Sequence, residues 1–592
     1  MKRSIKVILA LLLVVIVLWR CSTNHSTSTA VNKYLPQDVK QSCTIAQDSF
    51  ARWFDSGKVT LNGPVTAANS VTFPHNNNCD FYNWSEHMLL WLTSPSKEGR
   101  SVLESSLFYN VSPIIDGKRH LIQHSPGDTL RMINHLDKEG PHHLPVFKDS
   151  TGKLLEIENA GPEPVTHVAA FVKSDNAGST EVAKVTEEPN GKLHFLALNG
   201  KELTHPKALI QHAHPENFVE RFQVGKHFVF LDSKGHTVES ESAQATDDVL
   251  LSRKGAMVYY LTLVNDMYAY YMMGAKKGVL DSMHFPTTAG ARDSICRYAR
   301  QVNGPATILP DSNTLAMEIK SAWVESSTLP DPQNYFQVKA TIQTYDTSNP
   351  NRWAPKPNGE KTVMMAMVGI HIVGSVAGHP EMIWSTFEHQ GVTPAAAYPY
   401  LNSKGDTITQ PADTGNNWVF NSNTASDSVN ISHATVFNAT TKKTTDTILS
   451  NNGFTISPSN TQLTFAFGST GLANPEDGSE AAANSEIISM NNNVRGDLAK
   501  GDIRANYLLI GATWTMSGTP PNGESYSDTS KENGVAIGSN VLANSTMETY
   551  FQSPSQSCFT CHNDNNGNLP RDLSHVYVRL MPMVPSNSNK KK

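Results

Sequence analysis

The chain has 592 residues, of which 39% are hydrophobic and 17% are charged. This balance excludes a disordered chain, and the length is sufficient for two to four domains. The formal net charge of −6 provides no basic field, so nucleic acid is not expected as a partner.

The first 22 residues are laid out like an export signal. The basic pair Lys2-Arg3 precedes an uncharged apolar run at residues 7–19, and a charged start followed by a short apolar core is typical of signal peptides. Cys21 resembles the lipidated cysteine of bacterial lipoproteins, although Trp19-Arg20 stand where that signal has small residues. We therefore expect residues 1–22 to be a signal peptide or an uncleaved signal anchor. Either one places the body in the periplasm or cell envelope. A membrane tether through the N-terminus is expected from an uncleaved anchor or a lipidated Cys21.

Residues 23–40 are rich in Ser, Thr and Asn and are interpreted as a linker. Export also changes the meaning of the cysteines that follow, because thiols are oxidised outside the cytoplasm. Cys43 and Cys79 could close a disulfide loop there, which leaves Cys296 as the odd cysteine.

An N-terminal α+β domain is expected over residues 41–300. Apolar residues recur on one face of residues 80–92, which predicts a helix. Glu86 and His87 lie in this stretch, and we interpret them as part of a polar helix face rather than as a metal-binding pair.

Three short segments have the pattern of β-hairpins, at residues 146–156, 229–239 and 401–408. Each has a strand, a turn with Asp or Asn followed later by Gly, and a second strand. The similarity ends with the hairpins, which favours convergent turns over a duplicated domain. Apolar residues at helical spacing over residues 257–273 predict a helix that ends near Gly274.

A β-rich, sandwich-like domain is expected over residues 301–530. Alternation at 315–323 and 337–342 predicts half-buried strands, and the apolar run at 363–370 predicts a strand covered on both faces. Several residues of metal-binding type follow: His371, His379, Glu381, Glu388 and His389. Their spacing matches no zinc pattern, so we interpret them as buried, hydrogen-bonded residues beside a sheet. His212 and His214 are interpreted as a loop pair.

Near its end the chain carries the motif Cys558-Phe-Thr-Cys561-His562. This spacing suits haem attachment, because both thiols can add to the vinyl groups of one haem while the histidine reaches the iron. The motif resembles that of c-type cytochromes. The resemblance implies haem c bound covalently to Cys558 and Cys561, His562 as the proximal iron ligand, and electron transfer to a redox partner that the sequence does not identify. Residues 531–592 are therefore interpreted as a c-type haem-binding segment.

The residues before the motif have the form of a capping box, Ser545-x-x-Glu548, which predicts a short helix. On that helix, Met547, Tyr550 and Phe551 would pack on a porphyrin.

The sixth iron ligand is expected to follow the motif. Met581 ranks first, Met583 and His575 are the alternatives, and the large domain could supply the ligand instead.

A weaker resemblance covers more of the chain. Residues 317–323, 369–372, 385–389 and 542–550, with the terminal motif, are similar to a large uncharacterised family of exported bacterial proteins that end in this motif. This resemblance implies no substrate.

The predicted fold class is α+β and predominantly β, with a sandwich-like, sheet-rich body and a short helical haem-binding segment. One-electron transfer is the favoured function. One alternative is a haem enzyme or small-ligand sensor with an open iron site. The other is a surface binding or structural protein whose motif forms a disulfide or a metal site.

Overall fold

The computed structural model of this chain describes residues 35–583 apart from internal gaps. These gaps are residues 113–117, 134–145, 149–153, 157–169, 174–178, 188–192, 198, 204–218, 225–226, 233–236, 241–248, 416, 422–431, 434–435, 439–442, 446–447, 451–455, 550–551, 553–556, 564–566 and 578. The predicted export signal, Cys21 and the pair His212 and His214 lie outside the described residues. Within the described part of the chain, no helix is both long and apolar enough to cross a membrane.

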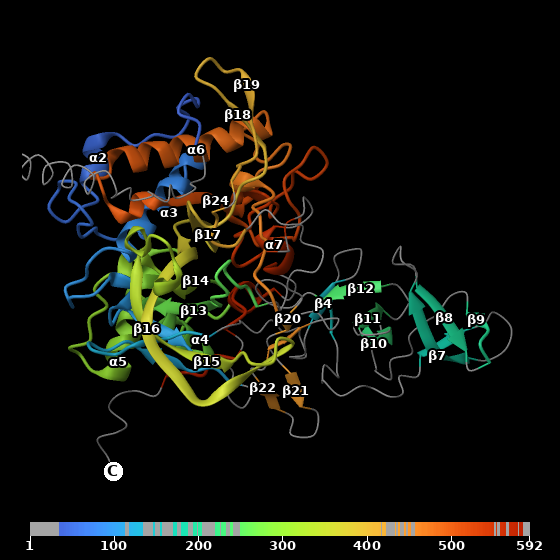
Figure 1. Ribbon diagram of the computed structural model, residues 1–592. Coiled ribbons are helices and arrows are strands. Elements are labelled where there is room, and N and C mark those ends of the chain that lie inside the picture. The colour runs from blue at the N-terminus through green and yellow to red at the C-terminus, as the bar shows by residue number, and fades with distance from the viewer. Residues whose placement is uncertain are drawn as a thin grey trace, which may run out of the picture.

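One twelve-stranded sheet organises the fold (Figure 1). Its main path, in spatial order, is β2 (Leu121–Gln123), β1 (Phe108–Val111), β13 (Val258–Asn265), β14 (Met317–Glu325), β16 (Arg352–Val376), β17 (His379–His389), β24 (Tyr507–Thr515) and β25 (Ala536–Gly538). The remaining strands extend from β16: β15 (Gln337–Asp346), β3 (Leu130–Arg131), β23 (Ile448–Ser450) and β20 (Ser432–His433). Only β3 and β15 pair in parallel in this sheet, as far as the structure describes it. The predicted class, α+β and predominantly β, is confirmed.

Helices cover both faces of this sheet. On one face lie α3 (Asn78–Leu92) and α6 (Glu480–Asp497), which run close together in Figure 1, with α2 (Gln47–Ala51) beside them. On the other lie α4 (Asp266–Lys276), α5 (Ala289–Asn303), α7 (Cys558–Cys561) and α8 (Leu569–Leu573). Alternation along the strands divides the side chains between two apolar clusters: Ile319 and Ile370 face α3 and α6, whereas Val373 faces α4 and α8.

The helix predicted at residues 80–92 is confirmed as α3, but the polar face proposed for it is wrong. Glu86 is only 3% exposed, and burial raises its pKa to about 8 although the positive charge of Arg495 opposes the shift. The His87 ring stacks on Trp53 with ring centroids 4.2 Å apart, and its Nε2 bonds the Thr66 carbonyl. Both polar side chains therefore belong to the interior between α3 and its neighbours.

The helix predicted at residues 257–273 is wrong in its first half. Residues Val258–Asn265 form β13, a strand in which every side chain is buried, and α4 begins only at Asp266. The Asn265 side chain accepts a hydrogen bond from the Tyr268 backbone N–H and so caps α4. An apolar run rich in β-branched and aromatic residues satisfies both periodicities, and here pairing with β1 and β14 selects the strand.

All the predicted hairpins are confirmed. The first is formed by β4 (Val146–Lys148) and β5 (Leu154–Glu156), the second by β11 (His227–Asp232) and β12 (Thr237–Ser240), and the third by β18 (Tyr398–Leu401) and β19 (Thr407–Gln410). The first two lie in one five-stranded sheet, because β12 pairs with β4 and β10 (Val219–Val224) pairs with β11. Three strands predicted further along are confirmed in β14, β15 and β16.

The smaller sheets lie outside the main path. One has four strands: β6 (Ala170–Lys173), β7 (Ser179–Glu187), β8 (Leu193–Ala197) and β9 (Glu202–Leu203). Another pairs β21 (Val436–Asn438) with β22 (Lys443–Thr445).

The large sheet does not respect the predicted domain boundaries. It takes β1 to β3 and β13 from residues 41–300, β14 to β17, β20, β23 and β24 from residues 301–530, and β25 from residues 531–592. The proposed linker also reaches into the body, because Val39 is buried and the Lys40 N–H donates to the Leu401 carbonyl. Residues 35–40 are therefore packed chain rather than linker.

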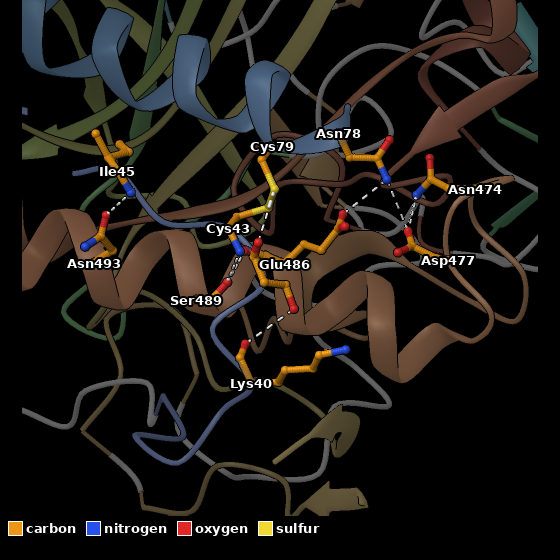
Figure 2. Close-up of a disulfide and its surroundings, with 11 residues drawn as sticks. Lys40, Cys43, Ile45, Asn78, Cys79, Asn474, Asp477, Glu486, Ser489 and Asn493 are labelled. Atoms are coloured by element: carbon orange, nitrogen blue, oxygen red, sulfur yellow. Dashed lines mark hydrogen bonds between the residues drawn. A yellow bond between two sulfur atoms is a disulfide. The ribbon is translucent and has the colours of Figure 1, made fainter. Parts of the chain in front are cut away.

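The predicted disulfide between Cys43 and Cys79 is present (Figure 2). It joins the N-terminal segment to the start of α3, over the surface of α6. Two backbone N–H groups of this segment also bond α6 side chains: Cys43 to Ser489 at 2.9 Å and Ile45 to Asn493 at 2.6 Å. The bridge and these bonds together fix the first described residues against the two helices.

Candidate functional site

The Cys-x-x-Cys-His motif forms one helical turn against the large sheet. The turn is α7, and the His562 backbone N–H continues it by donating to the Cys558 carbonyl. Cys558 is half-buried, and Phe559 is fully buried in the apolar cluster that includes residues of α4, α5 and α8. Phe559 packs edge-on against Trp384 of β17, with ring centroids 5.9 Å apart. An apolar anchor between the two cysteines therefore attaches the motif to the sheet.

His562 is held by contacts to its ring and to one ring nitrogen. Its Nδ1 lies 2.6 Å from the Leu573 carbonyl oxygen, at the end of α8. A carbonyl only accepts, so Nδ1 carries the proton and a neutral ring has its lone pair on Nε2. The ring also lies 4.4 Å from the Trp384 ring and stacks on His575 at 4.0 Å, centroid to centroid. These contacts set both the tautomer and the orientation of the imidazole.

The residue after Leu573 ties this arrangement to two elements of the body. The Ser574 hydroxyl donates to Glu318 of β14 at 2.5 Å and lies 2.7 Å from the Tyr268 hydroxyl of α4. Burial raises the pKa of Glu318, although the Ser574 hydrogen bond and the positive charge of Lys320 oppose the shift. The Leu573 carbonyl, which accepts the hydrogen bond from His562, is thus adjacent to Ser574, a residue that is hydrogen-bonded to both the sheet and α4.

Further contacts fasten the rest of the C-terminal segment. Lys276 of α4 donates to the Tyr577 and Leu580 carbonyls, each at 2.5 Å, and burial lowers the pKa of Lys276 to about 8. The Arg119 backbone exchanges hydrogen bonds with Arg579 and Met581, in a bridge between Arg119 and Leu580. The segment after the motif therefore packs into the body along its described length.

A polar row lies on the same face of the sheet. The strand register puts Lys320 of β14 opposite His371 of β16, and His371 opposite Thr386 of β17. His371 Nε2 is 3.0 Å from Glu548, in the loop just before the motif. Burial would raise the pKa of Glu548, but the charge and hydrogen bond of His371 lower it below its usual value. The row therefore presents charged and hydroxyl groups to the C-terminal loop.

The loop that covers this row fits closely on the strands. The Ser545 N–H donates to Glu388 at 2.6 Å, and the Tyr260 hydroxyl donates to the Thr546 carbonyl. A Cβ at Gly369 would lie 2.7 Å from the side-chain oxygen of Asn544, so the strand needs glycine at this contact.

The capping box predicted at Ser545 and Glu548 is wrong. The Glu548 carboxylate accepts from the Asn544 backbone N–H, one residue earlier than expected, and residues 542–549 form turns rather than a helix. Met547 is buried in a cluster with Tyr260, apart from the cluster that holds Phe559. Tyr550 and Phe551 lie outside the described residues. The hydrogen bonds to Glu388 and Tyr260 explain why this loop follows the sheet.

Five polar residues in β16 and β17 are predicted to be hydrogen-bonded side chains, and this is confirmed: His371, His379, Glu381, Glu388 and His389. His371 and Glu388 bond the C-terminal loop as described above. His379 lies 2.7 Å from Glu381, which accepts from the Thr515 N–H. His389 stacks on Tyr335 with centroids 3.6 Å apart and bonds the Asn334 carbonyl.

One group in the described part of the chain brings three residues of metal-binding type within reach of a single ion: Cys43, Cys79 and Glu486. Figure 2 shows Glu486 of α6 beside the bridged sulfurs. Cysteine binds metals as a thiolate, and the two sulfurs of a disulfide are not thiolates. Glu486 instead accepts from Asn78, which also donates to Asp477. This group is therefore structural.

The three sixth-ligand candidates take different positions. His575 stacks against a face of the His562 ring. Met581 is fixed by its backbone at Arg119, and Met583 packs at the edge of the apolar cluster of Phe559. All three side chains therefore lie on the packed segment that follows the motif.

Sequence reasoning missed Trp384, Leu573, Ser574 and Glu318. Trp384 and Glu318 follow apolar strand residues that face α3 and α6, which indicates that their own side chains lie on the opposite face of the sheet. No local signal pairs them with a motif some two hundred residues later in the chain.

Comparison with protein-family models, curated proteins and solved structures finds no match to this chain. Its function therefore has to be inferred from its own residues.

Proposed function

We propose that this protein is an exported c-type haem protein that transfers single electrons. Haem would be bound covalently by Cys558 and Cys561, with His562 as the proximal iron ligand. The observation that carries the proposal is the hydrogen bond from His562 Nδ1–H to the Leu573 carbonyl. A histidine that ligates a metal through one ring nitrogen commonly donates its other N–H to a backbone carbonyl or carboxylate.

The residues present fit this group. Positions 558 and 561 are one helical turn apart, and residues at this spacing share a helix face. The surroundings are apolar, with Phe559 and Trp384 beside the motif. When bound, the haem would supply an iron centre that changes by one electron. The chain would orient His562 through Leu573, shield one side of the site with the sheet, and supply Met581 or Met583 as the sixth ligand.

The alternative is a haem enzyme or small-ligand sensor whose iron has an open site. The hydrogen-bonded row of Lys320, His371 and Glu548 favours this candidate, because it places titratable side chains on the same face of the sheet as the motif. A structural protein whose motif forms a disulfide or metal site is the remaining alternative. In every case we propose export to the periplasm or cell envelope, with a membrane tether at the N-terminus. The electron-transfer function also requires a redox partner, which the chain does not identify.

Expression in a host with the cytochrome c maturation machinery tests the proposal. The purified full-length protein is run on a denaturing gel, stained for haem, and examined by absorption spectroscopy. We expect covalent haem in the wild type and none in the double variant C558A/C561A. The control variant Cys296→Ala should retain haem, because Cys296 lies on α5 away from the motif. Absence of haem from the wild type would overturn both haem functions.

The same spectra distinguish the two haem functions. A methionine-to-iron charge-transfer band that is lost in Met581→Ala or Met583→Ala would support electron transfer through a six-coordinate iron. Binding of carbon monoxide by the reduced protein, without such a band, would support the open-site alternative.

A further inference from the structure

A cavity of about 630 Å³ lies between α4, α5 and the segment that connects them. Its walls also include Pro380, near the start of β17. Pockets for small molecules have volumes of roughly 300 to 1,000 Å³, so this cavity is of suitable size. No residue of the Cys-x-x-Cys-His motif lines it, which separates it from the site described above.

The floor of the cavity is aromatic and apolar. Tyr271, Phe285, Ile295 and Tyr298 line it and are each at most 5% exposed. Phe285 packs against Tyr271 with ring centroids 5.5 Å apart, and the Tyr271 hydroxyl donates to the His284 carbonyl. The ring hydroxyl of Tyr271 is therefore already used, and its ring edge and that of Phe285 form a wall suited to a flat apolar ligand.

The polar groups of the cavity come from α5 and from the segment before it. The residues of this helix that line it are spaced as one helical face: Ala291, Ser294, Ile295, Tyr298 and Gln301, with Arg297 at the border. Arg297 and Gln301 are four residues apart, so both donors project from the same side of the helix. A guanidinium matches the geometry of a carboxylate better than that of other acceptors.

The charges around the cavity favour one orientation for a ligand that carries an oxygen acceptor. The Tyr298 hydroxyl is too deeply buried to meet such a ligand. The opposite rim is less suited to an anion, because Asp281 and His284 lie together there, 3.3 Å apart. The acidic end of a ligand is therefore directed to the α5 side.

We propose that this cavity binds a small planar aromatic carboxylate. The ring would lie over the aromatic floor, and the carboxylate would bond Arg297 and Gln301. The cavity is close to the motif segment, since Met283 between α4 and α5 contacts Asn568 just before α8. Pro380 on its wall is four residues before Trp384 in β17. The binding itself does not depend on whether the motif carries haem.

Isothermal titration of the exported full-length protein with 2-naphthoate tests the proposal, and the neutral analogue 2-naphthamide serves as the comparison ligand. We expect one binding site for naphthoate and weaker binding of the amide. Arg297→Gln should weaken naphthoate binding about tenfold, equal to about 1.4 kcal/mol, and leave the amide unaffected. The matched control Arg300→Gln lies on the same helix but outside the cavity, and should change affinity less than about twofold.

A second variant tests the location independently of charge. Ala291→Trp places an indole in the cavity from its half-buried rim, where it does not remove core packing. We expect this variant to keep the wild-type thermal midpoint and to lose naphthoate binding. The proposal is overturned if naphthoate gives no heat of binding, if it binds no better than the amide, if Arg300→Gln weakens it as much as Arg297→Gln, or if folded Ala291→Trp binds it normally.

Discussion

Removing the disulfide between Cys43 and Cys79 would measure how strongly the N-terminal segment is held to the body. The bridge joins residues 36 positions apart. For a loop of this length, the chain-entropy relation gives about 13 cal/mol/K, which is about 4 kcal/mol at 25 °C. The variant C43A/C79A should therefore be less stable by about 4 kcal/mol. The backbone hydrogen bond from residue 43 to Ser489 does not involve the thiol and should remain.

Thermal unfolding followed by circular dichroism provides the assay. If all 592 residues unfold together, the entropy of unfolding is about 1.2 kcal/mol/K, and the loss lowers the midpoint by about 3 °C. A smaller cooperative unit around α3 and α6 would give a larger shift. The control is Cys296→Ala, which removes a half-buried thiol outside the bridge.

The same loss should follow from reducing the wild type, because the bridge acts mainly on the unfolded chain. An unchanged midpoint in both the variant and the reduced wild type would refute this reasoning. Protein made in a reducing cytoplasm should resemble the variant, which links the stability of the fold to the proposed export.

Three further substitutions test the interior and the C-terminal loop. Gly369→Ala would push a Cβ against Asn544, so we expect a loss of about 1 to 3 kcal/mol and faster proteolysis of residues 542–549. Glu86 binds a proton more tightly in the folded state, so the free energy of unfolding should fall as pH rises from about 4.5 to about 8. Glu86→Gln should remove this decline. Compared with the wild type, the variant should therefore gain up to about 5 kcal/mol in the free energy of unfolding between pH 4.5 and pH 8.5, measured by urea unfolding. Ser574→Ala removes the hydroxyl that donates to the partly buried Glu318, so the free energy of unfolding should fall by about 1 to 3 kcal/mol in the same measurement. An unchanged free energy of unfolding would argue against a stabilising role for this hydrogen bond.

Local patterns predicted much of the fold because short-range chemistry decides it. The third hairpin illustrates this: Leu401 pairs with Thr407, the Asn402 side chain bonds the turn, and Gly405 takes a φ of 87°. Such turns depend only on residues within reach of one another along the chain. The disulfide was also predictable, since the expected export favours disulfides and the small cysteine count leaves few pairings.

Tertiary contacts decided where sequence reasoning failed. Residues 258–265 are buried at every position and most of them are apolar or aromatic, so no alternation marks them as a strand. Only pairing with β1 and β14 on either side excludes the helix. The prediction that Glu86 lies on a polar helix face was wrong for the converse reason. A carboxylate on an amphipathic helix ordinarily faces solvent, but both sides of α3 are covered, and the only local sign of this is an apolar run around it.

The candidate site could be predicted only in part for a similar reason. The motif itself names Cys558, Cys561 and His562, because its chemistry is local. Its surroundings are set by strand register, which places Lys320 opposite His371 and brings Trp384 to the His562 ring. Registers depend on bulges such as those in β16 and β24, and a one-residue change would turn these side chains to the other face.

The position of the motif also bears on the purpose of the large body. β25 joins the main sheet at Gly538, 20 residues before Cys558, and α4 holds the chain again at Ser574. A cofactor at Cys558 would thus be bordered by α4, β14 and β17, which begin at Asp266, Met317 and His379, far earlier in the chain. These elements would determine which edge of it meets solvent and how apolar its surroundings are, and burial of this kind tunes the potential and reactivity of a metal centre. The elements that carry Trp384, Glu318 and Tyr268 therefore form part of the immediate environment of the motif segment, and separating residues 531–592 from the body would remove these three side chains from the site.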